Sequence, residues 1–141
     1  MGLLQGLAGN SKEVTREEAR AQYGPWLLPG EEIHSAYRLI RDGFCVTTQR
    51  VIIIDRQGVT GNKTRVKAID MRSIVAVTAE TAGWGVDDSE LEFTYIVSPN
   101  RRAPTVERAT YRAEFPKNFD ISALYRYFAQ VAWVNVSEIN A

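Results

Sequence analysis

The segment Phe44–Asp55, FCVTTQRVIIID, holds two apolar runs in which no polar residue alternates with the apolar ones. Short runs rich in β-branched and aromatic residues indicate strands. Antiparallel strands in a small protein usually keep one face in water and therefore alternate apolar with polar residues. Two strands without this alternation need a cover on both faces. We expect one face to join a core with Phe93, Tyr111 and Phe128, and the other to be covered by the segment Leu3–Leu7 or by another subunit.

The periodicity of the remaining chain predicts further strands and a C-terminal helix. From Ile121 to Ala132, apolar residues recur at intervals of three and four, and Asp120 is placed to cap the N-terminus of that helix. Period-two alternation and short apolar runs predict seven strands. The predicted strands lie at residues 33–40, 44–48, 51–56, 63–70, 74–80, 90–97 and 109–115.

A second helix is predicted near the start of the chain. Thr15 and Glu18 have the spacing of a capping box, which opens a helix that continues to about Tyr23. The chain is therefore predicted to be mainly β, with an N-terminal helical extension. Seven antiparallel strands followed by an amphipathic helix favour two packed sheets or a partly open barrel, with the C-terminal helix closing one end.

Length and charge narrow the classes of function. With 141 residues the chain is expected to form one domain at residues 31–135, preceded by the extension at 1–30 and followed by a tail at 136–141. Seventeen basic and seventeen acidic side chains cancel, which argues against a nucleic-acid-binding surface. The sequence shows no signal-peptide pattern and no apolar run long enough to cross a bilayer, so we expect a cytoplasmic protein.

The central part of the sequence resembles a known family. The stretch AYRLIRDGFCVTTQRVIIIDRQGVTGNK, with the later segments MRSI and ETAG, is similar to the bacterial pleckstrin-homology-like family, formerly a domain of unknown function. The resemblance extends from about Gly2 to Ala132, and Arg38–Asp42, Thr48–Arg50 and Gln57–Gly61 are its most specific parts. It implies the seven-stranded PH-like fold with a C-terminal capping helix, a cytoplasmic location, homo-oligomeric rings and no established catalytic activity.

Residues that commonly carry enzymatic chemistry are few and scattered. His34 is the only histidine and lies in a predicted strand without other metal ligands at a suitable spacing. Cys45 lies in an apolar run and has no neighbouring base that the sequence reveals. Asp87 and Asp88 belong to an acidic turn without the spacing of a calcium loop. We therefore expect no catalytic residue, no cofactor and no metal site.

The charges are segregated along the chain, although their sum is zero. Patches of opposite sign allow head-to-tail docking between copies, which closes into a ring if the rotation permits; alternatively, the patches face each other within one subunit or stay solvated. The basic stripe also gives a weaker alternative, contact with anionic lipid headgroups. The basic set is Arg50, Arg56, Lys63, Arg65 and Lys67, and the acidic set is Glu80, Asp87, Asp88, Glu90 and Glu92.

Three leucines near the N-terminus form a further candidate contact. Leu3, Leu4 and Leu7 have helical spacing, and we rank the protein's own surface first as their contact, a neighbouring subunit second and a membrane last. Together these patterns predict a non-enzymatic module that self-associates and acts as a scaffold or adaptor, with itself or another protein as partner. The alternative is a peripheral module that binds anionic lipid headgroups or a peptide.

Overall fold

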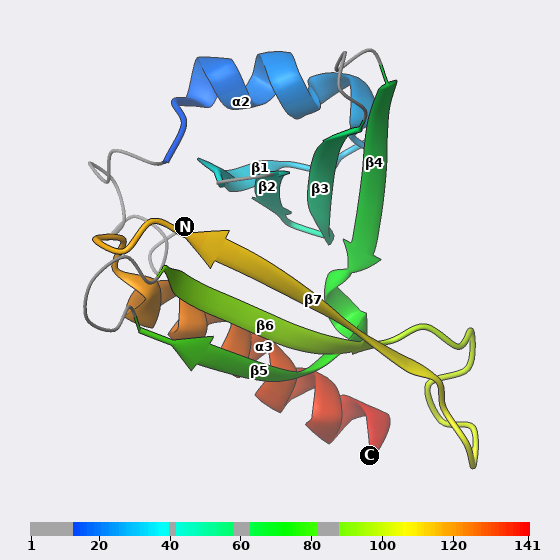
Figure 1. Cartoon of the computed structure of the whole chain (residues 1–141). Helices are drawn as coiled ribbons and strands as arrows, with labels where there is room; N and C mark the ends of the chain where they lie inside the picture. Colours follow the sequence, from blue (N-terminus) through cyan, green and yellow to red (C-terminus); the bar gives the residue numbers. More distant parts are fainter. Residues whose placement is uncertain (1–12, 40–41, 58–62, 82–87) are drawn as a thin grey trace.

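The computed structural model describes residues 13–39, 42–57, 63–81 and 88–141, with the side chains of 56 and 57 left out (Figure 1). Two α-helices in this part flank a set of strands: α2 (Arg16–Tyr23) and α3 (Ile121–Ile139). Short 3-10 turns lie at η1 (Gly24–Trp26) and η2 (Met71–Ser73). The strands are β1 (Ile33–Arg38), β2 (Asp42–Thr47), β3 (Arg50–Gln57), β4 (Lys63–Asp70), β5 (Ile74–Glu80), β6 (Ser89–Ile96) and β7 (Arg108–Phe115).

The strands form two antiparallel sheets. The first sheet has the order β1-β2-β3-β4 and the second has the order β5-β6-β7, with η2 carrying the chain from one sheet to the other. Figure 1 shows the sheets facing each other, with α2 over the outer side of the first sheet and α3 along the second. The predicted arrangement of two sheets with a C-terminal helix is confirmed. The result is a sandwich and not a closed barrel.

Local signals in the sequence place both helices correctly. Thr15 is the N-cap of α2, and its side chain and that of Glu18 form the reciprocal hydrogen bonds of a capping box. Asp120 caps α3 by accepting a hydrogen bond from the N–H of Ser122. Helix α3 continues to Ile139, well past the last residue of the predicted stripe. The predicted domain boundary at residue 135 thus falls inside this helix.

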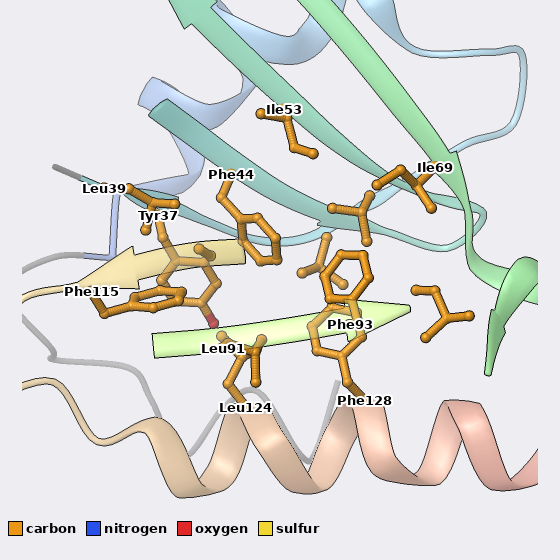
Figure 2. Packing of buried hydrophobic residues seen from close by; sticks show 14 of the residues in the cluster. Tyr37, Leu39, Phe44, Ile53, Ile69, Leu91, Phe93, Phe115, Leu124 and Phe128 are labelled. Carbon is orange, nitrogen blue, oxygen red and sulfur yellow. The ribbon is translucent and has the colours of Figure 1, made fainter. Parts of the chain in front are cut away.

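The main core fills the space between the two sheets and α3. Phe44 lies at its centre and is fully buried, with Phe93 of β6 and Phe128 of α3 among its ring neighbours. Figure 2 shows Leu124 and Phe128 pointing from α3 toward Phe93 and Phe44. One face of β2 and β3 therefore joins the core that the sequence predicts, because Val46, Val51 and Ile53 belong to the same cluster.

The other face of β2 and β3 is covered by α2. Ala19 and Tyr23, one helical turn apart, pack with Cys45, Ile52 and Ile54 in a second cluster of buried residues. The expectation that residues 3–7 or another subunit would cover this face is therefore wrong. Those leucines lie outside the described residues, and α2 of the same chain supplies the cover. These strands lack alternating polar residues because both faces of the sheet are buried here.

Gly43 is the position that lets α2 approach the sheet. A Cβ atom there would collide with the buried hydroxyl of Tyr23 and would lie 3.0 Å from Nε2 of Gln22. We expect Gly43→Ala to lower the free energy of unfolding by about 1–3 kcal/mol, because α2 has to shift or Tyr23 has to leave its position. Urea denaturation followed by circular dichroism measures this loss.

Gly24→Ala is the matched control for Gly43→Ala. A Cβ atom at Gly24 meets nothing within 4 Å apart from its two chain neighbours, and the backbone there is helical. Since Pro25 follows and disfavours a helical backbone in a residue with a Cβ, this variant should lose some stability, but less than Gly43→Ala. Equal stability of the two variants would contradict the close packing of α2 on β2.

Candidate functional site

Arg50, a member of the predicted basic patch, is held inside the subunit. Its Nη2 donates to Oε1 of Glu31 at 2.7 Å and to the carbonyl oxygen of Trp26 at 2.8 Å, while its Nε donates to Oε2 of Glu31 at 3.0 Å. The side chain of Glu31 is fully buried and also accepts hydrogen bonds from the Thr47 hydroxyl and the N–H of Leu28. Through these hydrogen bonds Arg50 connects the start of β3 to the loop that precedes β1.

The Glu31 carboxylate makes stability depend on pH in the acidic range. Burial alone raises the pKa of Glu31, but the hydrogen bonds from Arg50, Leu28 and Thr47 together lower it from 4.5 to about 2. Because the pKa is lower in the folded state, the stabilisation is complete above about pH 4.5 and is lost as the pH falls toward 2. We expect a lower melting temperature at about pH 2.5 than at about pH 5, and a smaller difference in Glu31→Gln. An unchanged difference in that variant would contradict this assignment.

The rest of the predicted basic patch lies on β4 and the end of β3. Lys63 and Arg65 are exposed, whereas Lys67 is half-buried and its Nζ lies 5.4 Å from the centre of the Tyr95 ring on the other sheet. The side chain of Arg56 is outside the described part. The exposed cations of the predicted stripe are thus at the beginning of β4.

Three of the predicted acidic residues are neighbours on the second sheet. Glu80 of β5 stands opposite Glu90 of β6 in the strand register, and Glu92 follows on the same face. Arg112 of β7 lies 3.5 Å from Glu90 and 3.4 Å from Glu92, so one cation partly neutralises this group within the subunit. Asp88 is half-buried before β6, and Asp87 lies outside the described residues. Glu80, Glu90 and Glu92 are therefore on the second sheet, whereas the basic residues are on the first, and the role of both sets in self-association stays a prediction.

A pocket of about 650 Å³ lies between η2 and one side of α3; we call it the η2 pocket. Asn135 of α3 closes its base, because its side-chain N–H groups donate to the carbonyl oxygens of Met71 and Ile74 at 2.8 Å each. The rim is polar and includes Arg72, whose guanidinium pairs with Asp70 at 2.9 Å. The apolar lining comes from Leu28, Met71, Tyr127, Val131 and Val134.

A second hollow of about 440 Å³ lies between α3 and β5; we call it the β5 groove. Its walls are almost entirely apolar, formed by valine and alanine side chains of both elements and by Trp133. Trp133 is 74% exposed, which makes it the most exposed large apolar side chain in the described chain. Val134 and Val136 beside it are also exposed. The C-terminal half of α3 thus presents apolar side chains to solvent on both of its sides.

Sequence reasoning did not select these residues of α3, although a signal was present. The segment 131–136 reads VAWVNV, which holds more apolar residues than one stripe of a surface helix can bury. The predicted stripe stops at Ala132, immediately before Trp133. Extending the helix by one turn would have revealed the apolar side chains outside the stripe.

Two features of the described residues bear on enzymatic chemistry. No three His, Cys, Asp or Glu side chains among them lie close enough together to hold a metal ion. Cys45 is fully buried, and burial raises the pKa of its thiol to about 12, so the nucleophilic thiolate is suppressed at neutral pH. In the part of the chain that the structure covers, no helix is both long enough and apolar enough to cross a membrane.

The fold and these surfaces define a class of protein: a small sandwich of two antiparallel sheets that a C-terminal helix closes, which is the PH-like fold. The chain belongs to the bacterial PH domain family, whose sequence model matches residues 2–132. This family is generally non-enzymatic. A curated relative, the uncharacterized protein YjqA of Bacillus subtilis (strain 168), is 38% identical over 92 residues, which are 65% of this chain and 74% of YjqA.

Solved structures agree with this assignment. A pleckstrin homology domain from Shewanella amazonensis SB2B is 34% identical, with a TM-score of 0.64 over 93% of this chain and 98% of that one. A DUF1696 family protein with a pleckstrin-homology domain from Shewanella loihica PV-4 is 31% identical, with a TM-score of 0.62 over 89% and 99%. A PH-domain-containing protein from Exiguobacterium sibiricum 255-15, 20% identical with a TM-score of 0.64 over 86% and 62%, shares the fold. The resemblance to the bacterial PH-like family is confirmed.

Proposed function

We propose that the protein is a non-enzymatic PH-like module of the cytoplasm that self-associates, in a ring-shaped homo-oligomer, and serves as a scaffold or adaptor. The observation that carries the proposal is the exposed apolar surface on the C-terminal half of α3. Clustered apolar side chains next to hollows are typical of surfaces that bind protein. Trp133, with 74% of its surface in contact with solvent in the single chain, gains most from burial in such a contact.

The mass of the protein in solution tests this proposal. We expect multi-angle light scattering at micromolar concentration to give a multiple of the 15.8 kDa chain mass. Apolar contacts resist salt and charge contacts do not, so a sodium chloride series separates the contribution of α3 from that of the charged strands. A strict monomer over the whole concentration range would refute self-association.

A second candidate function is contact with an anionic membrane surface. The exposed side chains of Lys63 and Arg65 on β4, together with the exposed guanidinium of Arg72, favour it. Near such a surface each cation contributes on the order of 1 kcal/mol. Sedimentation with vesicles that contain phosphatidylserine, compared with vesicles of phosphatidylcholine alone, tests this function. Binding that does not depend on lipid charge would exclude it.

A further inference from the structure

We propose that the η2 pocket and an arginine-lined hollow next to it form one binding site for a small amphiphilic anion. Such a ligand has an apolar body and a carboxylate or phosphate group at one end. The proposal goes beyond self-association and does not depend on it, because every residue of the site comes from one chain. The site requires an apolar compartment, a cationic compartment beside it, and cations that the fold positions without neutralising them.

The cationic compartment is a hollow of about 320 Å³ between η2, the segment that follows β6 and the end of α3; we call it the arginine pocket. Its lining includes Arg72, Arg101 and Arg102. Arg72 and Asn135 line both this hollow and the η2 pocket, so the two compartments adjoin each other. A guanidinium presents several N–H donors in one plane and can bind the oxygens of a carboxylate or phosphate group in pairs.

Asp70 holds two of these arginines in position. Its Oδ2 accepts hydrogen bonds from Nη2 of Arg72 at 2.9 Å and from Nη2 of Arg101 at 3.0 Å, and its Oδ1 accepts one from Nε of Arg72 at 3.2 Å. A single carboxylate is thus shared by two guanidiniums, which leaves a positive charge on the group. The hydrogen bonds of the described residues also leave Nη1 of both arginines for a further acceptor.

Arg102 holds the wall of the arginine pocket in position. Its guanidinium donates to the backbone oxygens of Ile139 at 3.0 Å, Glu138 at 3.3 Å and Ala141 at 2.6 Å, all at the end of α3. Its backbone N–H donates to Oδ1 of Asn100 at 2.9 Å. The segment after β6 is thereby connected to α3. The lining also includes the exposed residue Glu138, whose negative charge opposes an anionic ligand.

The apolar compartment is the η2 pocket. Its volume of about 650 Å³ lies within the usual range for sites that enclose a small ligand, and Met71, Val131 and Val134 contribute apolar contacts. Arg50 also lines this pocket, but its guanidinium is bonded to the buried carboxylate of Glu31. The positive charge that a ligand can use is therefore at the other end of the site, in the arginine pocket.

This separation determines which ligands the site prefers. A molecule with an apolar body places that body in the η2 pocket and its anionic group beside Arg72 and Arg101. Inorganic phosphate uses the arginine pocket alone, and a neutral alcohol uses the η2 pocket alone. An amphiphilic anion uses both compartments and is therefore expected to bind more tightly than either of them.

Isothermal titration calorimetry with octanoate and with octyl phosphate, below their critical micelle concentrations, tests the proposal. Octan-1-ol and inorganic phosphate are the reference ligands. We expect at least one of the two amphiphiles to bind with a dissociation constant at least about 10-fold below those of both reference ligands, the effect of a hydrogen-bonded charge. If neither amphiphile binds more tightly than octan-1-ol, the proposal is refuted.

Four variants assign the binding to the two compartments. Arg101→Gln should raise the dissociation constant of the amphiphile at least about 10-fold and leave that of octan-1-ol unchanged. Val134→Trp, at a position that is 40% exposed, fills the η2 pocket and should weaken the amphiphile and octan-1-ol alike. Glu138→Gln removes the opposing charge and should lower the dissociation constant about 2–5-fold. Arg108→Gln is the control, because Arg108 is an exposed arginine outside both hollows.

Circular dichroism checks that each variant is folded. The exposed position of Glu138 keeps the test decisive even if Arg101→Gln unfolds, because Glu138→Gln changes the affinity in the opposite direction. Unchanged affinity for the amphiphile in the folded Arg101→Gln and Glu138→Gln variants would refute the arginine pocket as the anion site. Sedimentation with vesicles that contain phosphatidic acid shows whether a membrane lipid or a soluble compound supplies the anion. A monomeric protein that binds the amphiphile through Arg101 would refute the proposed self-association and support this site.

Discussion

Replacement of Phe44 by alanine is expected to lower the free energy of unfolding by about 3–5 kcal/mol. Phe44 is fully buried, and five other aromatic rings lie around it, with centroids 6.1–6.5 Å from its own. These neighbours come from both sheets and from α3, so they cannot collapse together into the space that the ring leaves. The cost thus includes the lost burial and the cavity. The five rings are those of Tyr37, Phe93, Tyr111, Phe115 and Phe128.

Chemical denaturation measures this loss, and two further variants calibrate it. Phe44→Leu keeps most of the volume and should cost less than Phe44→Ala. Tyr125→Ala changes an exposed aromatic residue of α3 and should stay within about 0.5 kcal/mol of the unaltered protein. A loss below about 1 kcal/mol in Phe44→Ala would show that this side chain does not hold the two sheets and the helix together.

Arg50→Ala is expected to lower the free energy of unfolding by about 3 kcal/mol. The variant leaves the carboxylate of Glu31 fully buried without its charged partner, and it removes two hydrogen bonds to that carboxylate. It also leaves the carbonyl oxygen of Trp26 without this donor. Arg65→Ala, which removes an exposed guanidinium from β4, serves as the control and should be nearly neutral.

A double-mutant cycle separates the pair from its surroundings. If the loss in Arg50→Ala arises from the unpaired carboxylate, then adding Glu31→Gln to Arg50→Ala should recover part of the stability. Additive losses in the double variant would instead place the effect of Arg50 outside its contact with Glu31. Urea denaturation at neutral pH suffices for all four proteins.

The elements of this fold could be predicted from the sequence because their signals are local. The capping box at Thr15, the N-cap at Asp120 and the two-residue period of the strands each involve residues a few positions apart. The cover over the second face of β2 and β3 could not be predicted in the same way. The contact of Tyr23 with Gly43 joins positions twenty residues apart, and no local pattern determines which helix lies on which face.

The candidate site was harder to predict, for two physical reasons. A count of charges does not show that Glu31, directly after the Pro29-Gly30 turn, is buried beside Arg50 and binds it. It also does not show that Arg112 lies between Glu90 and Glu92. The apolar surface around Trp133 depends on where α3 ends, and helix ends are less well determined by periodicity than helix centres.

The packing of α2 on the sheet has a kinetic consequence. Cys45 is the only cysteine of the chain and lies beneath this helix, in one cluster with Ala19 and Tyr23. A thiol reagent reacts with Cys45 only after this part of the structure opens, since the side chain is inaccessible when α2 is in place. At high reagent concentration the rate of labelling becomes the rate of opening itself. The rate at which Cys45 is labelled therefore reports the rate at which α2 separates from the sheet.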